Sequence, residues 1–140
     1  MGTKFSTRVW VSVVGIASIF FGSKGYADTV ISVADFGLKP DTRENAVAYV
    51  QKAIEACRGK EPVTLVFPEG RYDFWPQYAH EKNYYETNTY DVFPKRLAML
   101  FEGLHNITVD GNGSQFVMHD RIQPITVENC DGVTLKNFSI

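Results

Sequence analysis

The sequence predicts an all-β solenoid in which short strands stack as a parallel β-helix. The main observation is that residues 98–111 and 124–137 repeat one pattern at a 26-residue offset. The apolar positions that coincide are Met99 with Ile125, Phe101 with Val127, Ile107 with Val133, and Val109 with Leu135. A short β-rich repeat with a constant in/out pattern is typical of a solenoid. An amphipathic helix before the repeats and turns rich in Gly, Asn and Asp support the same class. About two coils fit before the sequence stops in mid-strand, so we expect the opening of a longer protein.

Residues 1–27 have the layout of a secretory signal peptide. Lys4 and Arg8 precede an apolar run from Val9 to Phe21, and Gly25 and Ala27 supply the small residues that signal peptidase reads. The apolar run has 13 residues, whereas a membrane-spanning helix needs about 20. We therefore expect cleavage after Ala27, an extracytoplasmic (periplasmic or secreted) location and no stable membrane insertion. The alternative is an uncut N-terminal anchor.

The charge of the chain excludes one class of partner. The formal net charge is −2, and removal of the signal peptide takes away Lys4, Arg8 and Lys24, which leaves a more acidic chain. Such a chain has no electrostatic basis for binding nucleic acid, so we expect no nucleic-acid partner.

The cysteines and histidines do not indicate a metal centre. Cys57 and Cys130 are far apart in the predicted fold, so two separate buried thiols are the favoured interpretation, with a disulfide left open. His80, His105 and His119 are single residues that we interpret as surface or packing histidines. No cofactor and no metal are expected.

Residues 28–74 are predicted to form an N-terminal cap. It begins with a strand over 29–33 and continues with a helix over 41–59, in which Asp41 and Glu44 form an N-terminal capping pair and Gly59 stops the helix. Strands follow at 63–67 and 71–74. The helix has one apolar stripe, so we expect it to cover the open end of the first coil.

The remainder divides into an insertion and the coils. Residues 75–96 are rich in aromatic residues without a clear period, so they are interpreted as an ordered loop or insertion. The first coils occupy 97–140, with strands near 97–101, 106–109, 115–118, 124–128 and 133–138. Alternation turns Ile107 and Val133 inward and makes Asp110 and Lys136 stacked neighbours on the outside.

Several stretches carry a resemblance to a known family. Residues 34–37, 51–54 and 66–72 resemble the N-terminal cap of the pectate-lyase-like superfamily of right-handed β-helices. Residues 106–114, 116–119 and 133–140, with the aromatic insertion before them, are similar to the start of glycoside hydrolase family 110. The resemblance implies a right-handed β-helix and a secreted exo-acting α-galactosidase that removes terminal α-1,3-linked galactose with inversion. It also implies a carbohydrate partner, namely α-galactosyl-terminated glycans.

No catalytic residue is expected within this chain. Inverting hydrolysis requires two carboxyl groups roughly 6.5–9.5 Å apart, one to protonate the leaving oxygen and one to activate water. None of the family's catalytic acids matches a position here. The acidic residues of the coils all have simpler roles in turns or at strand ends; they are Asp110, Asp120, Glu128 and Asp131. The fragment alone is therefore expected to be inactive.

The aromatic insertion supplies the candidates for substrate contact. Aromatic faces bind the C–H faces of a pyranose, and polar side chains read its hydroxyl groups. The candidates are Trp75, His80, Tyr84, Tyr85 and Asn88. The alternative is that these rings pack the insertion onto the cap or the outer surface of the first coils.

Two other functions remain open on sequence grounds. One is a β-helix polysaccharide lyase or polygalacturonase, although a lyase needs clustered basic residues and only Arg121 and Lys136 stand in the coils. The other is a non-catalytic glycan-binding β-helix protein.

Overall fold

The computed structural model describes residues 28–83 and 94–140. The predicted signal peptide (1–27) and residues 84–93 of the predicted insertion lie outside the described residues. The elements in order are β1 (Thr29–Ser32), the 3₁₀ helix η1 (Val33–Phe36), α1 (Val47–Cys57), β2 (Val63–Val66), β3 (Arg71–Phe74), β4 (His80–Asn83), β5 (Pro94–Glu102), β6 (His105–Met118), β7 (Gln123–Glu128) and β8 (Asp131–Ser139). This composition confirms the predicted all-β class. In the described part of the chain, no helix combines the length and apolar character that crossing a membrane requires.

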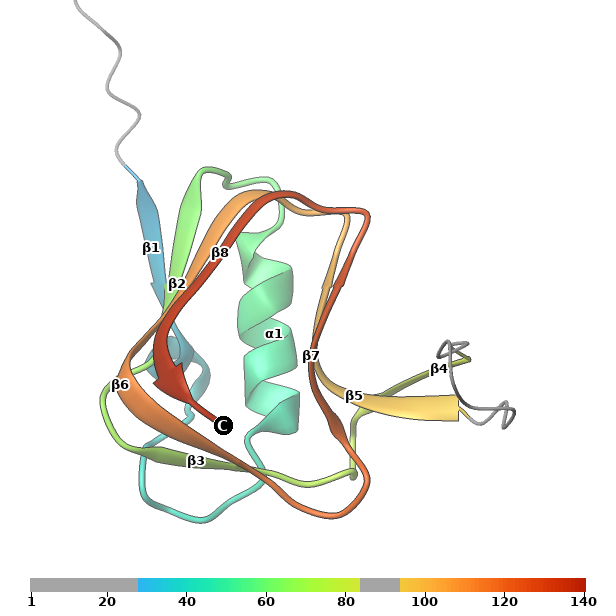
Figure 1. Cartoon of the computed structure of the whole chain (residues 1–140). Helices are drawn as coiled ribbons and strands as arrows, with labels where there is room; N and C mark the ends of the chain where they lie inside the picture. The colour runs from blue at the N-terminus through green and yellow to red at the C-terminus, as the bar shows by residue number, and fades with distance from the viewer. Residues whose placement is uncertain (1–27, 84–93) are drawn as a thin grey trace, which may run out of the picture.

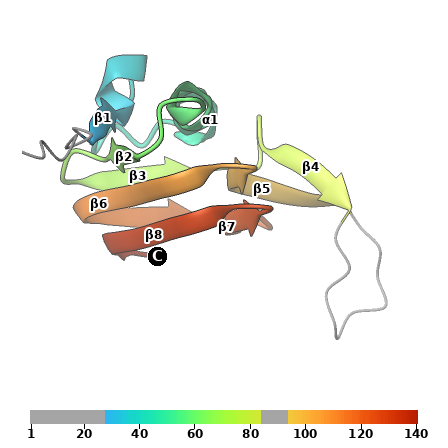
Figure 2. The same cartoon turned by 90° about the horizontal axis from the view of Figure 1, so that it is seen from above.

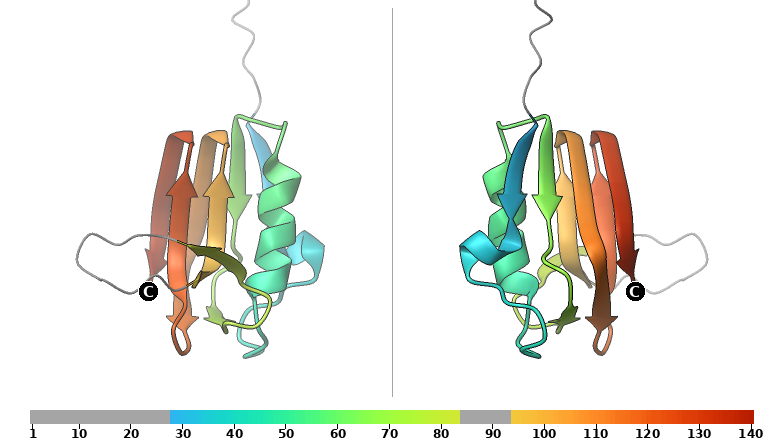
Figure 3. Two further views of the ribbon diagram at one scale, coloured as in Figure 1. Left: turned by 90° about the vertical axis from the view of Figure 1, so that its right-hand side faces the viewer. Right: turned by 90° about the vertical axis from the view of Figure 1, so that its left-hand side faces the viewer.

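The strands form two sheets that are parallel apart from one strand. In the first, β1 pairs with β2, both β2 and β3 pair with β6, and β8 pairs with β6 along its other edge. In the second, β5 pairs in parallel with β7, and β4 lies antiparallel to β5. Figures 1 and 3 show β6 directly beside β8 and β5 beside β7, so successive segments of chain stack in the same order in both sheets.

The 26-residue offset of the sequence repeat is also the register in which β5 pairs with β7 and β6 with β8. Met99 lies opposite Ile125 and Phe101 opposite Val127 across the β5–β7 pair. Ile107 lies opposite Val133 across the β6–β8 pair. These are the pairs that the 26-residue offset predicts, so the predicted stacking is confirmed. The outward pair is confirmed too, because Lys136 Nζ lies 3.3 Å from Asp110 Oδ2.

The turns between stacked strands repeat as well. Gly103 and Asn129 have φ angles of 63° and 50° at equivalent positions before β6 and β8. Asn106 and Gly132, the next equivalent pair, have φ angles of 48° and 69°. Gly and Asn are the residues that adopt this left-handed conformation most readily. The first turn therefore has Gly followed by Asn at these two positions, and the second has Asn followed by Gly.

Helix α1 covers one end of the stacked strands. Looking along the stack, α1 lies inside the outline that the strands trace (Figure 1), and from above it lies at the end beside β2, away from the C-terminus (Figure 2). Its buried face consists of Val47, Val50, Ala53, Ile54 and Cys57. This face continues the apolar core, so the expected covering role of the helix agrees with its position.

The core beneath the helix is rich in aromatic rings. Phe116 of β6 lies between rings from neighbouring strands, with centroids 5.6 Å from Phe74 and 4.9 Å from Phe138. Both Phe74 and Phe116 are buried. Contacts of this kind add to the free energy gained by burying apolar area and link three successive strands.

The predicted start of the helix at Asp41 is wrong. Helix α1 begins at Val47, and Asp41 has a left-handed φ of 63°. The Asp41 carboxylate accepts a hydrogen bond from Arg71 N (3.0 Å), so it serves β3 and not a helix N-terminus. Asn45 Oδ1 instead accepts from Val47 N (3.2 Å) at the true helix start. Gly59 lies just beyond the end of the helix at Cys57, with a φ of 75°.

The predicted ordered loop or insertion over 75–96 contains a strand that the sequence did not predict. Residues His80–Asn83 form β4, and β4 pairs antiparallel with the first part of β5, from Pro94 to Leu97. The strand was missed because its sequence (His-Glu-Lys-Asn) is entirely polar, and three of its four residues are exposed. A strand whose residues are all polar shows no alternation of apolar and polar residues, so the sequence pattern cannot identify it.

Candidate functional site

The candidate site begins at the end of β3. Alternation along this strand places Tyr72 and Phe74 in the core, so Arg71, Asp73 and Trp75 face the other side. Asp73 is nevertheless only 2% exposed. A buried carboxylate requires cationic or hydrogen-bonding partners, and the side chains that contact Asp73 connect it to the candidate site.

Asp73 is held by two cationic or hydrogen-bonding side chains. Arg71 donates to both carboxylate oxygens, from Nε to Oδ2 (2.9 Å) and from Nη2 to Oδ1 (2.7 Å). His119 Nε2 lies 2.6 Å from Oδ1. The hydrogen bonds from Arg71 lower the pKa of Asp73 to about 2; burial opposes this shift, and the hydrogen bond from His119 adds to it. Asp73 is thus ionised at neutral pH, and His119 Nε2 is the donor.

His119 in turn supports the ring of Trp75. The two rings are stacked, with centroids 3.7 Å apart and planes inclined by 2°. Trp75 N also donates to Asn45 Oδ1 (3.1 Å). The Trp75 side chain is therefore fixed from one side while the residue remains 41% exposed.

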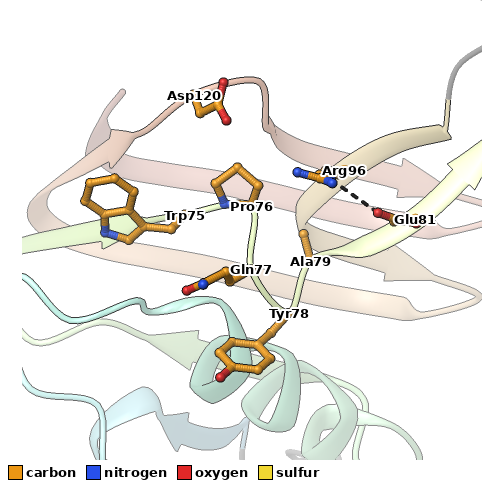
Figure 4. Close-up of a pocket in the computed structure, with 8 residues that line it drawn as sticks. All are labelled: Trp75, Pro76, Gln77, Tyr78, Ala79, Glu81, Arg96 and Asp120. Atoms are coloured by element: carbon orange, nitrogen blue, oxygen red, sulfur yellow. Dashed lines mark hydrogen bonds and ion pairs between the residues drawn. The ribbon is translucent and has the colours of Figure 1, made fainter.

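Next to Trp75 lies an open hollow of about 510 Å³ (Figure 4). Its lining comes from the β3–β4 connection, the hairpin and the β6–β7 connection: Trp75, Pro76, Gln77, Tyr78, Ala79, Glu81, Arg96 and Asp120. Arg96 Nε donates to Glu81 Oε1 across the hairpin (3.2 Å). The hollow therefore combines aromatic surface with groups that can donate and accept hydrogen bonds.

The sequence candidates do not all meet here. Trp75 lines the hollow, whereas His80 lines a different one, beside Gln51, Lys52 and Glu55 of α1. Tyr84, Tyr85 and Asn88 lie outside the described residues. Sequence reasoning missed Asp73, Arg96 and the contact of His119 with Trp75. The pairing of β3 with β6 was the available signal, because it carries Trp75 to the level of His119.

Three other acidic residues of the stacked strands, Asp110, Glu102 and Glu128, have structural partners. Asp110 Oδ1 accepts from Asn137 Nδ2 and from Asn112 N, both at 2.9 Å, and these hydrogen bonds lower the pKa of Asp110. Lys82 Nζ lies 2.6 Å from Glu102 Oε1 and 2.9 Å from Glu128 Oε2. Asp110 and Glu128 thus have the structural roles that the sequence predicts.

The two cysteines are separate free thiols, as favoured from the sequence. Cys57 is buried in α1, and this burial raises the pKa of its thiol to about 11. Within residues 28–83 and 94–140, no three His, Cys, Asp or Glu side chains are grouped in a way that could hold a metal ion.

Several known proteins with similar sequences are named alpha-1,3-galactosidase A or B. A scan against protein-family models finds no match. The alpha-1,3-galactosidase B of Bacteroides thetaiotaomicron is 62% identical over 114 residues, which cover 81% of this chain and 18% of the relative. The alpha-1,3-galactosidase A of Shewanella woodyi is 40% identical over 110 residues (79% of this chain, 18% of the relative). A protein of Phocaeicola vulgatus, also named alpha-1,3-galactosidase B, is 38% identical over 136 residues (94% and 21%).

These matches extend over most of the chain, although the chain spans only about one fifth of the length of these relatives. They agree with the resemblance that the strand repeats and the cap indicate. The chain belongs to the family of bacterial proteins named alpha-1,3-galactosidase.

Proposed function

We propose that this chain is the N-terminal part of a secreted, exo-acting α-galactosidase that hydrolyses terminal α-1,3-linked galactose with inversion. The observation that supports this most strongly is the identity of 62% over 81% of the chain with a protein named alpha-1,3-galactosidase B. The substrate is an α-galactosyl-terminated glycan. Residues 1–27 act as the signal peptide, and cleavage after Ala27 delivers the protein outside the cytoplasm.

The architecture we propose is a right-handed parallel β-helix. Residues 28–74 form its N-terminal cap, 75–96 an insertion that includes the β4 hairpin, and 97–140 the first coils. The parallel pairing of β6 with β8 and of β5 with β7 supports this architecture. A β-helix supports glycan hydrolysis because its stacked coils provide a long rigid surface on which side chains from different coils keep fixed spacings.

The catalytic pair belongs to a part of the enzyme outside this chain. An inverting enzyme needs one protonated and one ionised carboxyl group, roughly 6.5–9.5 Å apart and free to approach a sugar and a water. Here Asp73 is held by Arg71 and His119, and Asp110 is held by Asn137 and Lys136. Glu128 is held by Lys82. Because these carboxylates are committed to structural partners, they cannot serve as the catalytic pair, and we expect no hydrolytic activity from the 140-residue chain alone.

The test uses the product of the complete gene that contains this sequence. Galactose release is measured from galactose-α-1,3-galactose, with an α-1,6-linked galactoside and polygalacturonate as comparison substrates. We expect release from the α-1,3-linked substrate, and proton NMR at early times should detect β-galactose, the product of inversion. The 140-residue chain is the matched inactive control.

Two results would contradict the proposal. Cleavage of polygalacturonate without release of galactose supports the lyase or polygalacturonase alternative. Binding of the glycan without any cleavage supports the non-catalytic alternative.

A further inference from the structure

We propose that the hollow beside Trp75 is a binding site for one neutral pyranose residue. That a terminal galactoside is its ligand rests on the proposed function, whereas the site itself rests on the geometry below. The lining residues come from segments far apart in the sequence, and Figure 4 shows Trp75 at the left, Asp120 and Arg96 toward the top and Tyr78 at the bottom.

The Trp75 ring is a prearranged stacking surface. One support is His119, whose ring stacks on Trp75 at 3.7 Å and is itself hydrogen-bonded to the buried Asp73. Arg71 fixes Asp73 with two further hydrogen bonds. A ring held in this way loses little conformational freedom when a ligand stacks on it, so little of the binding free energy is lost to ordering.

The backbone that carries the aromatic residues is also fixed. Asn45 Nδ2 donates to Gln77 O (2.9 Å), and Gln51 Nε2 of α1 donates to Tyr78 O (2.9 Å). These bonds connect the β3–β4 connection to the helix and to the segment before it. The wall of the hollow is thus anchored to the folded cap.

The polar groups around the hollow suit the hydroxyl groups of a sugar. Arg96 binds Glu81 through Nε, and the guanidinium and the carboxylate together present donors and acceptors at one side. The Asp120 carboxylate is exposed and has no hydrogen-bond partner among the side chains in the described part of the chain. In Figure 4 it lies on the same side of the hollow as Arg96, across from Tyr78.

The charges of the lining favour a neutral sugar over an acidic one. Glu81 and Asp120 carry negative charge, and Arg96 is already paired with Glu81. A uronic acid would bring its carboxylate close to that of Asp120, which costs free energy. A terminal galactoside is neutral, and its C3–H, C4–H and C5–H groups form an apolar patch opposite the axial 4-hydroxyl group, which suits stacking on Trp75.

Trp75 allows a direct measurement of binding. The chain has two tryptophans, Trp10 and Trp75, so the full chain with Trp10→Phe has Trp75 as its only indole. We expect a saturable change in its fluorescence when galactose-α-1,3-galactose is titrated into a dilute solution. Asp120→Asn in the same background should weaken binding at least about tenfold, because a charge-assisted hydrogen bond becomes a neutral one. Asp131→Asn, which makes the same change at an exposed carboxylate of β8 outside this hollow, is the matched control and should leave binding unchanged.

Trp75→Ala removes the fluorescent reporter, so this variant is tested by saturation-transfer NMR with the same disaccharide. We expect the substitution to abolish the saturation-transfer signal. Circular dichroism checks that each variant is folded. Digalacturonate should bind at least about tenfold more weakly than the neutral disaccharide. The proposal is overturned if no saturable change occurs, or if folded Trp75→Ala and Asp120→Asn variants bind as well as the parent. Equal binding of digalacturonate overturns the preference for a neutral ligand. Because these readouts measure binding by this chain and not turnover, they can fail independently of the galactosidase assay.

Discussion

His119 Nε2 lies 2.6 Å from Asp73 Oδ1, although 46 positions separate the two residues in the sequence. Asp73 belongs to β3 and His119 follows β6, so this contact joins the two paired strands at the end where the candidate site lies. The contact also determines the position of the Trp75 ring, since that ring stacks on His119.

Replacement of Asp73 with Asn should destabilise the protein in a pH-dependent way. The pKa of Asp73 is lowered to about 2 by Arg71 and then by His119, below its ordinary value of 3.8. A lowered pKa stabilises the fold above the ordinary pKa, and this stabilisation is lost as the pH falls from about 4 to about 2. At neutral pH, Asp73→Asn should therefore lower the free energy of unfolding by about 1–3 kcal/mol.

Denaturant unfolding between pH 2 and pH 7 measures this effect. The difference between Asp73→Asn and the parent should shrink toward pH 2. Asp131→Asn, which changes an exposed carboxylate, is the control and should show little difference. A constant difference at all pH values would show that the ionised carboxylate is not the cause.

Gly111 should be the glycine of β6 least tolerant of alanine. A Cβ at this position would lie 2.5 Å from Phe138 Cβ and 2.7 Å from Asn137 O, both on the paired strand β8. The clash involves the backbone of the neighbouring strand, so relief requires the two strands to separate. We expect Gly111→Ala to lower the free energy of unfolding by about 3 kcal/mol.

Gly59→Ala is the matched control for this change. Gly59 has a φ of 75° but no atom within 4 Å of the added Cβ, so only backbone strain of about 1–2 kcal/mol opposes the substitution. Thermal unfolding of the two variants compares the costs. Equal costs would mean that the close approach of β6 and β8 is not what requires glycine at position 111.

Lys82 should hold the β4 hairpin against the stacked strands. Its ammonium group bridges Glu102 and Glu128, which lie opposite each other on β5 and β7. The hydrogen bonds that Lys82 donates to Glu102 and then to Glu128 raise the pKa of Lys82 above its ordinary value. Lys82→Met should leave two neighbouring carboxylates without this cation and loosen the hairpin.

Hydrogen exchange of the β4 amides reports this loosening. Exchange should become faster in Lys82→Met and at high salt, because salt screens the interaction. Lys52→Met, which removes an exposed lysine of α1, is the control and should leave the β4 amides unaffected. Unchanged exchange rates in Lys82→Met would show that backbone pairing alone holds the hairpin in place.

The stacking of β8 on β6 was predictable because the sequence itself repeats at a constant offset. The 26-residue offset fixes which residue of β8 lies opposite Ile107, and the same offset places Lys136 beside Asp110. The helix start was not predictable from pattern alone. Asp41 is a residue type that often caps helices, but in the folded chain it contacts Arg71, and the N-cap of α1 is Ala46, which makes no side-chain capping hydrogen bond.

The site was only partly predictable for a related reason. Trp75 is recognisable as an aromatic residue in a polar insertion, but its neighbour His119 comes from the next stacked segment. The insertion after Phe74 lengthens the offset from 26 residues to 44, since Arg71 lies opposite Gln115, so the 26-residue repeat does not predict that Asp73 and His119 meet. A histidine that is isolated in the sequence thus acquires its role only through the pairing of β3 with β6.

A polypeptide of residues 28–140 should self-associate through the face formed by β7 and β8. Val127 and Leu135 are 46% and 39% exposed there. Among the described strands, β8 pairs only with β6, so its other edge presents unpaired backbone groups to a second copy.

Sedimentation velocity should show sedimentation coefficients that increase with protein concentration. Leu135→Lys should reduce this growth, because a charge on an edge strand opposes pairing. Tyr78→Lys replaces an even more exposed apolar side chain (74% exposed) away from this edge and should have little effect. A monodisperse monomer with a sharp thermal transition at all concentrations would show that the β7–β8 face does not drive association.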